Sequence, residues 1–524
     1  MATRQAAIPA VLDMHGQPMR RTAEAYRAGS AFSREMTNWN PYPGSADADL
    51  LGGLTSIVAR TRDIAQNHGF GSGVMQTHLD NVIGGNLRLS AKPNWRALGL
   101  DADWADEFAR ETEAAWRLHA YDPRKFCDAA RACSMPGLIG LAYRSVFLNG
   151  AALAIPQWLE RPGAMFATAI QMIEPDRLCN PLGQPDTDRL RGGVEIDEFG
   201  AALAYHIRNS HPGDMFLTGG VAEEWTRVPR ETDWGRSLVI HAYDVERIGQ
   251  SRGKPVLTPI LEHLKMITRY EAAELQAAIV NAIFAAFIES PFDTSLLGEE
   301  LGADDLKKYQ DQRADYHEDK SIRLDGVKIP HLFPGEKFTF TTPTRPNSGL
   351  ESFMAGALRN IAAGTGLSYE QISRDYSKTN YSSARAAMVE SWKFFRRVRQ
   401  QFSADFCTPI YALWLEEAID KGIVKLPPGA PDFWEAYAAY VDCKWIGPSM
   451  GWIDPLKEAD AVARRLELNV TTLEDECAAQ GLDYDEVLQQ RAREIKRMQQ
   501  LGLTPAAASP EGRTYSSDRE LAAN

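Results

Sequence analysis

The sequence predicts an α+β fold. Long stretches that lack Gly and Pro and are rich in Ala, Leu and Glu predict helices in the second half of the chain. In the first half, a segment with an apolar residue at every second position predicts a β-hairpin. The chain has 524 residues, of which 44% are hydrophobic and 24% charged. It is therefore long enough for roughly two to four domains with a sizeable core.

Charge and cysteine use narrow the class of protein. The formal net charge of −13 argues against a protein whose main task is to hold nucleic acid by phosphate contacts, because such proteins usually carry a basic excess. The cysteines form no C-x-x-C pair, and no histidine is spaced to complete a zinc site, so we expect buried thiols. They are Cys127, Cys133, Cys179, Cys407, Cys443 and Cys477.

The sequence also bears on localisation. Its N-terminus has no apolar core followed by a small-residue cleavage site, which predicts synthesis in a reducing cytoplasm without export. The longest uncharged apolar run, Leu275–Ile288, has about 14 residues, whereas a helix needs roughly 20 to cross a bilayer. We therefore expect no membrane span.

The first half mixes helices and strands. Residues 1–50 lack periodicity and predict an extended arm that orders only against a neighbour, although a floppy terminus fits equally well. Ala48–Asn81 and Asp101–His119 carry helical periodicity, and Leu138–Ile155 is apolar and favours β structure. Gly193–Ile207 predicts a hairpin that turns at Gly200. Together these elements predict a mixed α+β domain that ends near residue 250.

Helices dominate after Pro259. Ile260–Glu289 predicts one helix of about 30 residues, some 45 Å long. A charged insert with short β pieces such as Lys337–Thr341 follows at residues 291–346. A second helix is expected over Ser348–Ala363, where the small residues Ala355, Gly356 and Ala357 allow a neighbouring helix to come close.

A polar loop, DYSKTNYSSAR at Asp375–Arg385, leads into a third long helix predicted over Ser383–Asp420, with a kink at Pro409. Residues 455–500 are highly charged and helical in pattern. The tail from Pro505 is rich in Ala, Ser and Gly, which predicts disorder.

No motif predicts catalysis, a metal or a cofactor. GQSRGKP at 249–255 brackets three residues between its glycines, and Pro255 follows Lys254, whereas a phosphate-binding loop needs four residues and a Ser or Thr. GFGSG at 69–73 lacks the spacing of a nucleophile elbow or a dinucleotide fingerprint and predicts a bend between helices. The ten histidines include no HExxH pair.

Several ordered segments nevertheless resemble one family. From residue 334 the sequence reads PGEKFTFTTPTRPNSGLESFMAGALRNIAAGTGLSYEQISRDYSKTNYSSARAA. Other segments are RDIAQNHGFGSGVMQTHLDNVIGGNLRL at 62–89, IEPDRL at 173–178, GVEIDEFGAALAYHI at 193–207 with HPGD at 211–214, GQSRGKP at 249–255, and WIGPSMGWIDPLKEADA at 445–461. In this order, they closely resemble the portal proteins of lambda-like tailed bacteriophages over most of residues 30–465.

The resemblance implies a virion component that is not an enzyme. Such portals form rings, usually of twelve subunits, at one vertex of the phage head, through which DNA is packaged and later ejected. Implied partners are further copies of the chain, the terminase large subunit that hydrolyses ATP, the major capsid and scaffold proteins, the head-tail connector, and double-stranded DNA bound without sequence specificity. No membrane or cofactor is implied, and assembly is expected in the host bacterial cytoplasm.

The resemblance also implies a layout. It consists of an N-terminal arm (1–50), a mixed α/β wing (51–255 and 383–454, the latter opening with the long helix), a first stem helix (256–290), an α/β clip (291–346), a second stem helix (347–366), a channel loop (367–382), a helical crown (455–503) and a disordered tail (504–524). A loop that touches moving DNA of every sequence needs polar side chains that form and lose phosphate contacts cheaply, which suits the DYSKTNYSSAR segment.

Candidate functional residues follow from that layout. The residues expected to face the channel are Arg374, Lys378, Asn380 and Tyr381. Basic positions expected behind them are Arg385, Lys393, Arg396 and Arg397. The alternative is a solvated helix face, which the polar loop beside them makes less favourable. Ala355, Gly356 and Ala357 are expected to pack in the stem. The alternative functions are an ATP-dependent packaging enzyme, which would need a nucleotide site, and a head-completion or shell protein, which would lack two long helices around an insert.

Overall fold

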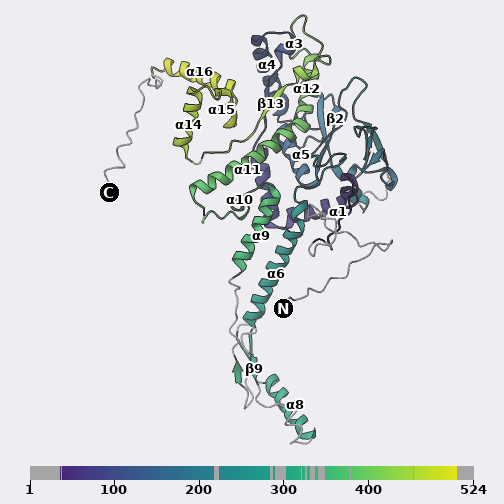
Figure 1. Cartoon of the computed structure of the whole chain (residues 1–524), viewed down its shortest axis with the longest axis vertical. Helices are drawn as coiled ribbons and strands as arrows, with labels where there is room; N and C mark the ends of the chain where they lie inside the picture. The colour runs from purple at the N-terminus through teal and green to yellow at the C-terminus, as the bar shows by residue number, and fades with distance from the viewer. Residues whose placement is uncertain are drawn as a thin grey trace, which may run out of the picture.

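The computed structural model describes residues 36, 38–216, 224–283, 287–289, 303–319, 321–324, 327–330, 337–339, 349–377, 379–452 and 454–503. Figure 1 shows a mixed α/β body from which two helices, α6 (Leu261–Ile283) and α9 (Leu350–Thr365), project side by side. We call this pair the limb. A group of three helices, α14 to α16, lies beside the body. The predicted mixed helix-and-sheet fold is confirmed.

Five helices open the body. They are α1 (Ala46–Asn67), α2 (Gly69–Val82), α3 (Trp95–Leu98), α4 (Ala102–Ala120) and α5 (Met135–Asn149). The Ser45 side chain caps α1 by accepting from the Ala48 amide, and His68, with extended backbone, separates α1 from α2. The predicted bend at Gly69–Gly73 therefore begins one residue earlier, at His68, and the glycines lie in the first turns of α2.

One prediction in this region was wrong in part. Residues 138–149, predicted as β structure, belong to helix α5. Pro136 occupies the first turn of α5, where its missing N–H costs nothing, and Gly150 ends the helix at φ 86°. The apolar run was ambiguous because a buried helix and a buried strand both tolerate it. Only the residues from Ala151 onward form a strand.

Two small antiparallel sheets complete the body. One has the order β3-β2-β8 and the other β4-β5-β6-β7. Their strands are β2 (Ala151–Trp158), β3 (Thr168–Ile173), β4 (Leu190–Arg191), β5 (Val194–Ile196), β6 (Ala202–Arg208), β7 (Trp225–Pro229) and β8 (Ile240–Tyr243). The predicted hairpin is confirmed, with Val194 opposite Tyr205 and Gly200 at φ 87° in the turn. A further pair joins β1 (Arg88–Ala91) to β13 (Cys443–Ile446). Short 3-10 turns lie at Pro175–Arg177 (η2), Pro181–Gly183 (η3), Pro212–Phe216 (η4) and Thr258–Ile260 (η5).

The first helix of the limb is shorter than predicted, and the second keeps its predicted length but begins two residues later, at Leu350. Helix α6 ends at Ile283, and Phe287–Glu289 forms strand β9, which pairs with β12 (Lys337–Thr339). The apolar, aromatic residues after α6 fit a strand as well as a helix, and a pairing partner distant in sequence decides between them. The insert also contains α8 (Ala303–Asp319) and the hairpin of β10 (Ser321–Leu324) with β11 (Val327–Pro330).

The chain returns to the body through α10 (Tyr369–Ser373) and α11 (Tyr381–Phe402). A π-helical turn (η6, Ser403–Cys407) then leads into α12 (Thr408–Asp420), followed by α13 (Tyr437–Tyr440). The turn lies where a kink was predicted, because Pro409 has no N–H to continue the α-helical ladder. Helix α12 is the centre of the core, where Tyr411 and Trp414 are fully buried.

The last helices are α14 (Pro455–Glu467), α15 (Leu473–Ala479) and α16 (Tyr484–Gln500), as the charged helical pattern predicted. The tail from residue 504 and most of the N-terminal arm lie outside the described residues. Within the described part of the chain, no helix combines the length and apolar character that a bilayer span requires.

Candidate functional site

The polar segment before α11 is more structured than the loop expected at 367–382. Ser368 and Gln371 form a capping box at the start of α10, and Asn380 caps α11 by accepting from the Ser383 amide at 2.9 Å. Between α10 and α11, the described residues outside helices are therefore 374–377, 379 and 380. Asp375 accepts from the Ser377 amide at 2.9 Å, which tightens this stretch.

The four residues expected at the channel have different environments. Arg374 ends α10 at φ 57°, and its guanidinium donates to Thr77 Oγ1 of α2 at 3.0 Å. The Asn380 side chain serves as the cap of α11. Lys378 lies outside the described residues, as does the side chain of Tyr381, whose backbone opens α11. In the structure, Arg374 therefore links α10 to α2, and Asn380 caps α11.

Of the four predicted basic residues on α11, two form ion pairs with described residues and two do not. Arg385 contacts Glu458 of α14 at 2.5 Å, and Lys393 contacts Glu390 at 2.7 Å. Arg396 and Arg397 are exposed, and within the described chain neither has an ion-pair partner. Arg397 lies over the Phe394 ring, 5.4 Å from its centroid. These two guanidiniums are the cations of α11 that remain available to an anionic partner.

A fifth cation, Arg399, anchors α11 to the body. It lies over the Trp392 ring, 5.2 Å from its centroid, and donates to the carbonyls of Asn81 (2.7 Å) and Val82 (2.8 Å) at the end of α2. These carbonyls have no partner within their own helix, so the guanidinium caps it. Burial, with the nearby charge of Arg396, lowers the pKa of Arg399 to about 10.

His78 joins the limb to the body. One ring nitrogen contacts the Thr365 carbonyl at the end of α9 at 3.0 Å, and the other contacts the Tyr143 hydroxyl at 3.3 Å. Burial lowers the pKa of His78 to about 4, so the ring is neutral at pH 7. Phe147, Phe394 and Phe395 surround it. The sequence placed His78 on a helix but gave no sign of this junction.

The small residues of α9 do not mark its closest contact with the rest of the chain. A Cβ at Gly356 would meet nothing within 4 Å, whereas a Cβ at Gly364 would lie 2.6 Å from Ile260 Cγ2. Ala355 and Ala357 are half-buried. Gly356 therefore faces open space on a single subunit, and the close approach within the subunit occurs at Gly364.

GQSRGKP is a structural junction in this fold. The buried Arg252 guanidinium donates to the carbonyls of Pro175, Leu178 and Gly192 at 2.9, 2.6 and 2.7 Å. Lys254 pairs with Glu246. A Cβ at Gly253 would lie 2.0 Å from the Gly150 carbonyl oxygen, so this position requires glycine. Its charged residues are thus engaged by the protein itself.

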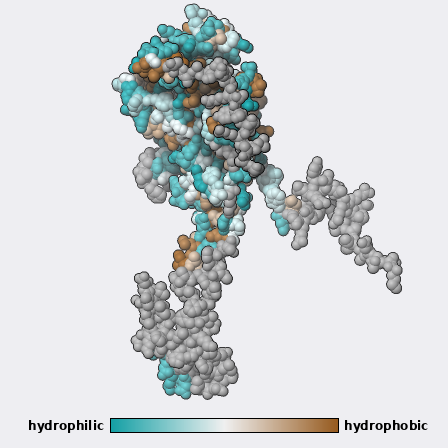
Figure 2. Space-filling view, turned by 90° about the vertical axis from the view of Figure 1, so that its left-hand side faces the viewer, coloured by the Kyte–Doolittle hydropathy of each residue, from teal (hydrophilic) through white to brown (hydrophobic). Residues whose placement is uncertain are grey.

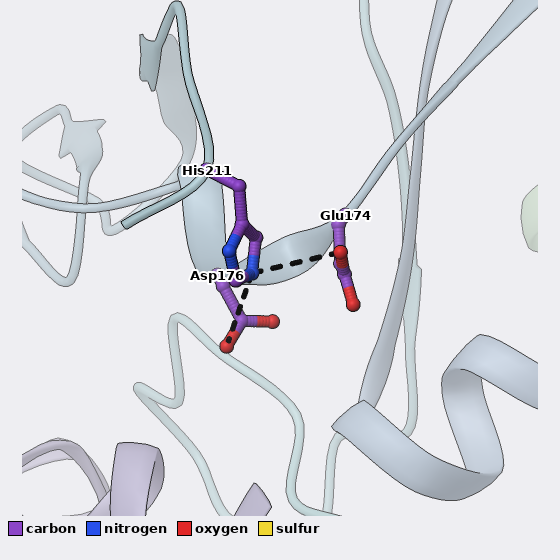
Figure 3. A group of neighbouring side chains, drawn as sticks. All are labelled: Glu174, Asp176 and His211. Carbon is purple, nitrogen blue, oxygen red and sulfur yellow. Dashed lines mark ion pairs between the residues drawn. The ribbon is translucent and has the colours of Figure 1, made fainter. Parts of the chain in front are cut away.

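Figure 3 shows a group of possible metal ligands that the sequence reasoning did not find: Glu174, Asp176 and His211. Their ligand atoms lie within 4.8 Å of one another. The guanidinium of Arg62 on α1 contacts Glu174 at 3.0 Å and also pairs with Asp176. A protein cation therefore already contacts both carboxylates, and the group links α1 to the sheet. It also joins the IEPDRL and HPGD segments.

Comparison with known proteins identifies the family. Residues 32–399 match the family of phage portal proteins described as the lambda family. The chain is 36% identical to portal protein B of Escherichia phage lambda and 35% identical to the portal protein of Escherichia phage N15, over 98% of both chains in each case. A probable portal protein of Halomonas phage phiHAP-1 is 26% identical, over 90% of this chain and 86% of the relative.

Similar solved structures include the neck of a native GTA particle, computed with C12 symmetry. The superposition has a TM-score of 0.44 at 12% sequence identity and covers 83% of this chain and 99% of the other. The neck of an empty GTA particle with C6 symmetry has a TM-score of 0.46 at 13% identity, over 80% of this chain and 93% of that one.

The chain belongs to the lambda family of phage portal proteins. The resemblance expected from the ordered segments is confirmed. Portal proteins are structural components of the virion rather than enzymes.

Proposed function

We propose that the chain assembles into a ring of about twelve copies through which double-stranded DNA enters and leaves a phage head. In this proposal α6 and α9 form the stem, residues 291–346 the clip, residues 51–255 and 383–454 the wing, and residues 455–503 the crown. The channel segment is shorter than first expected, at residues 374–381, and ends at the first residue of α11. The clip would dock the terminase large subunit and later the head-tail connector, and the outer surface would meet the major capsid and scaffold proteins.

The observation that carries the ring is the apolar surface of the limb. Met266, Leu275 and Ile279 on α6 are each more than half exposed, as is Phe353 on α9. Figure 2 shows apolar surface on this limb. Leu275 and Ile279 share one side of α6, whereas Met266 lies on the opposite side. Exposed apolar side chains gathered on one projecting element usually mark an interaction site. Neighbouring copies around a ring would cover them, because a closed ring repeats the same contact between every pair of subunits.

The charge distribution supports guidance of DNA rather than tight binding. Twelve copies at −13 each would carry a formal charge of −156, so most of the assembly would repel a polyanion at long range. Arg396 and Arg397 offer exposed cations behind the channel segment. Few cations on a largely anionic surface favour transient phosphate contacts over a stable complex.

Negative-stain imaging of the purified full chain tests the proposal. We expect rings with an axial hole close to the width of a DNA duplex. Monomers, or open filaments without a hole, would contradict it. ATP turnover by the same preparation, abolished by Lys254→Ala, would instead favour a packaging enzyme; we expect none, because Lys254 pairs with Glu246 and no phosphate cradle surrounds it.

A further inference from the structure

The helices after residue 455 contact the body through ion pairs. Glu458 of α14 contacts Arg385 of α11 at 2.5 Å. Glu486 of α16 contacts Arg88 at 2.9 Å and also pairs with Arg117 of α4. Glu474 of α15 contacts Lys92 at 3.0 Å. These contacts define which side of α14 and of α16 faces the body.

The opposite side of α16 is apolar. Leu488 and Ile495 are two and nine residues after Glu486, which places both about 180° around the helix from the body-facing side. They are 42% and 37% exposed. Arg491 lies near this outward face and is exposed. No residue of α16 is buried.

The outward side of α14 matches it in spacing and differs in charge. Leu456, Asp460, Ala463 and Glu467 lie opposite the body-facing Glu458, at the i, i+4, i+7, i+11 spacing of a helix-packing seam. Leu456 is 74% exposed. Asp460 and Glu467 form no ion pair with any part of the chain that the structure describes, and the same holds for Arg491 on α16.

The geometry points to a second copy of this chain as the partner of both faces. We propose that the outward face of α14 in one subunit packs against the outward face of α16 in its neighbour, with Leu456 and Ala463 against Leu488 and Ile495. Asp460 or Glu467 then meets Arg491. Two different, complementary faces on one subunit make a head-to-tail contact, which repeats around a closed ring. The apolar residues on both helices recur every seven residues and so can pack against each other. The opposite charges on the two faces favour α14 against α16 over either helix against its own copy.

This inference rests on the proposed ring and adds a contact that the limb does not supply. It accounts for two amphipathic helices with no buried residue in a single subunit. Such helices gain little stability from propensity alone and depend on packing of their apolar faces.

Maleimide labelling of rings that carry a single introduced cysteine tests the contact. The variants are Leu456→Cys and Ile495→Cys, and the matched control is Gln489→Cys, an exposed position about a quarter turn from the outward face of α16. The unmodified chain gives the background from its own cysteines. In rings we expect Leu456→Cys and Ile495→Cys to react at least about tenfold more slowly than Gln489→Cys, because an interface core excludes solvent. In unassembled subunits all three should react at similar rates.

The outcomes separate this inference from the proposed function. If the unmodified chain forms no rings, the proposed function itself fails. If rings form and the cysteines on the outward faces react as fast as the control, the crown contact is refuted while the ring stands. Protection that appears only when capsid proteins are added would assign these faces to a different partner and would also overturn the inference.

Discussion

At the scale of single residues, buried polar groups decide how the segments of the chain meet. Arg252, Arg399 and His78 each join elements distant in sequence through backbone carbonyls. None of these roles could be predicted from the sequence, because a carbonyl partner carries no sequence signal. GQSRGKP could be excluded as a phosphate loop from its spacing, but only the fold explains what Arg252 and Gly253 do.

Replacing Arg252 with methionine should destabilise the body strongly. Two buried carbonyls, of Pro175 and Leu178, and the half-buried carbonyl of Gly192 would lose their donor, and each orphaned buried group costs about 1–3 kcal/mol. We expect a clearly lower guanidinium chloride concentration at the midpoint of unfolding. Lys254→Met is the control, because its pair with Glu246 is partly exposed and worth about 1 kcal/mol or less. Equal midpoints for the two variants would refute the role assigned to Arg252.

Burial also predicts a pH dependence. The pKa of His241 is lowered from 6.5 to about 3 by burial and, secondarily, by Arg252. Below pH 6.5 the unfolded chain takes up a proton that the folded chain refuses, so stability falls as the pH falls from 6.5 toward 3. When the pH is lowered from 6 to 5, the free energy of unfolding of His241→Phe should therefore fall by about 1 kcal/mol less than that of the unmodified chain. Exposed His263→Gln is the control. An unchanged pH dependence in His241→Phe would contradict this.

At the scale of elements, the sequence predicted the helices well where periodicity was long and failed where an apolar run was short. The hairpin at 193–207 and the helices at 46–67 and 102–120 appear as expected. Residues 138–149 and the end of α6 did not appear as predicted, because packing against other parts of the chain decides between helix and strand for a short apolar run. Of the channel candidates, Asn380 turned out to be a helix cap, which its position before an amphipathic stretch could have indicated.

The stem assignment makes a prediction about α9. Gly356 faces open space within one subunit, so Gly356→Trp should leave the fold intact and instead push neighbouring subunits apart. We expect sedimentation to show fewer rings for Gly356→Trp and a normal ring fraction for Gly356→Ala. A normal ring fraction in the tryptophan variant would remove this surface of α9 from the subunit interface.

At the scale of the whole molecule, the proposed function requires an anionic protein to touch a polyanion weakly and at many equivalent points. The family relationship was accessible from ordered segments of sequence, whereas the packing of subunits was not, because a ring contact joins faces that one chain leaves bare. The limb and the helices after residue 455 both carry exposed apolar side chains that the proposed ring contacts would cover. Weak contacts repeated around a ring act together, so a small loss at each subunit becomes a large one for the assembly.

The most direct measurement is the length of DNA retained in heads assembled with the Lys378→Ala, Tyr381→Ala double variant. Lys393→Ala, which removes a cation already paired with Glu390, is the control. In the proposed channel these side chains would face solvent, where substitutions usually change stability by under about 0.5 kcal/mol, so ring yield should be normal. We predict that packaging starts normally and that DNA then slips as the head fills, leaving shorter DNA in the double variant. Full-length DNA at normal ring yield, or loss of the rings themselves, would contradict the assignment of this segment to the channel.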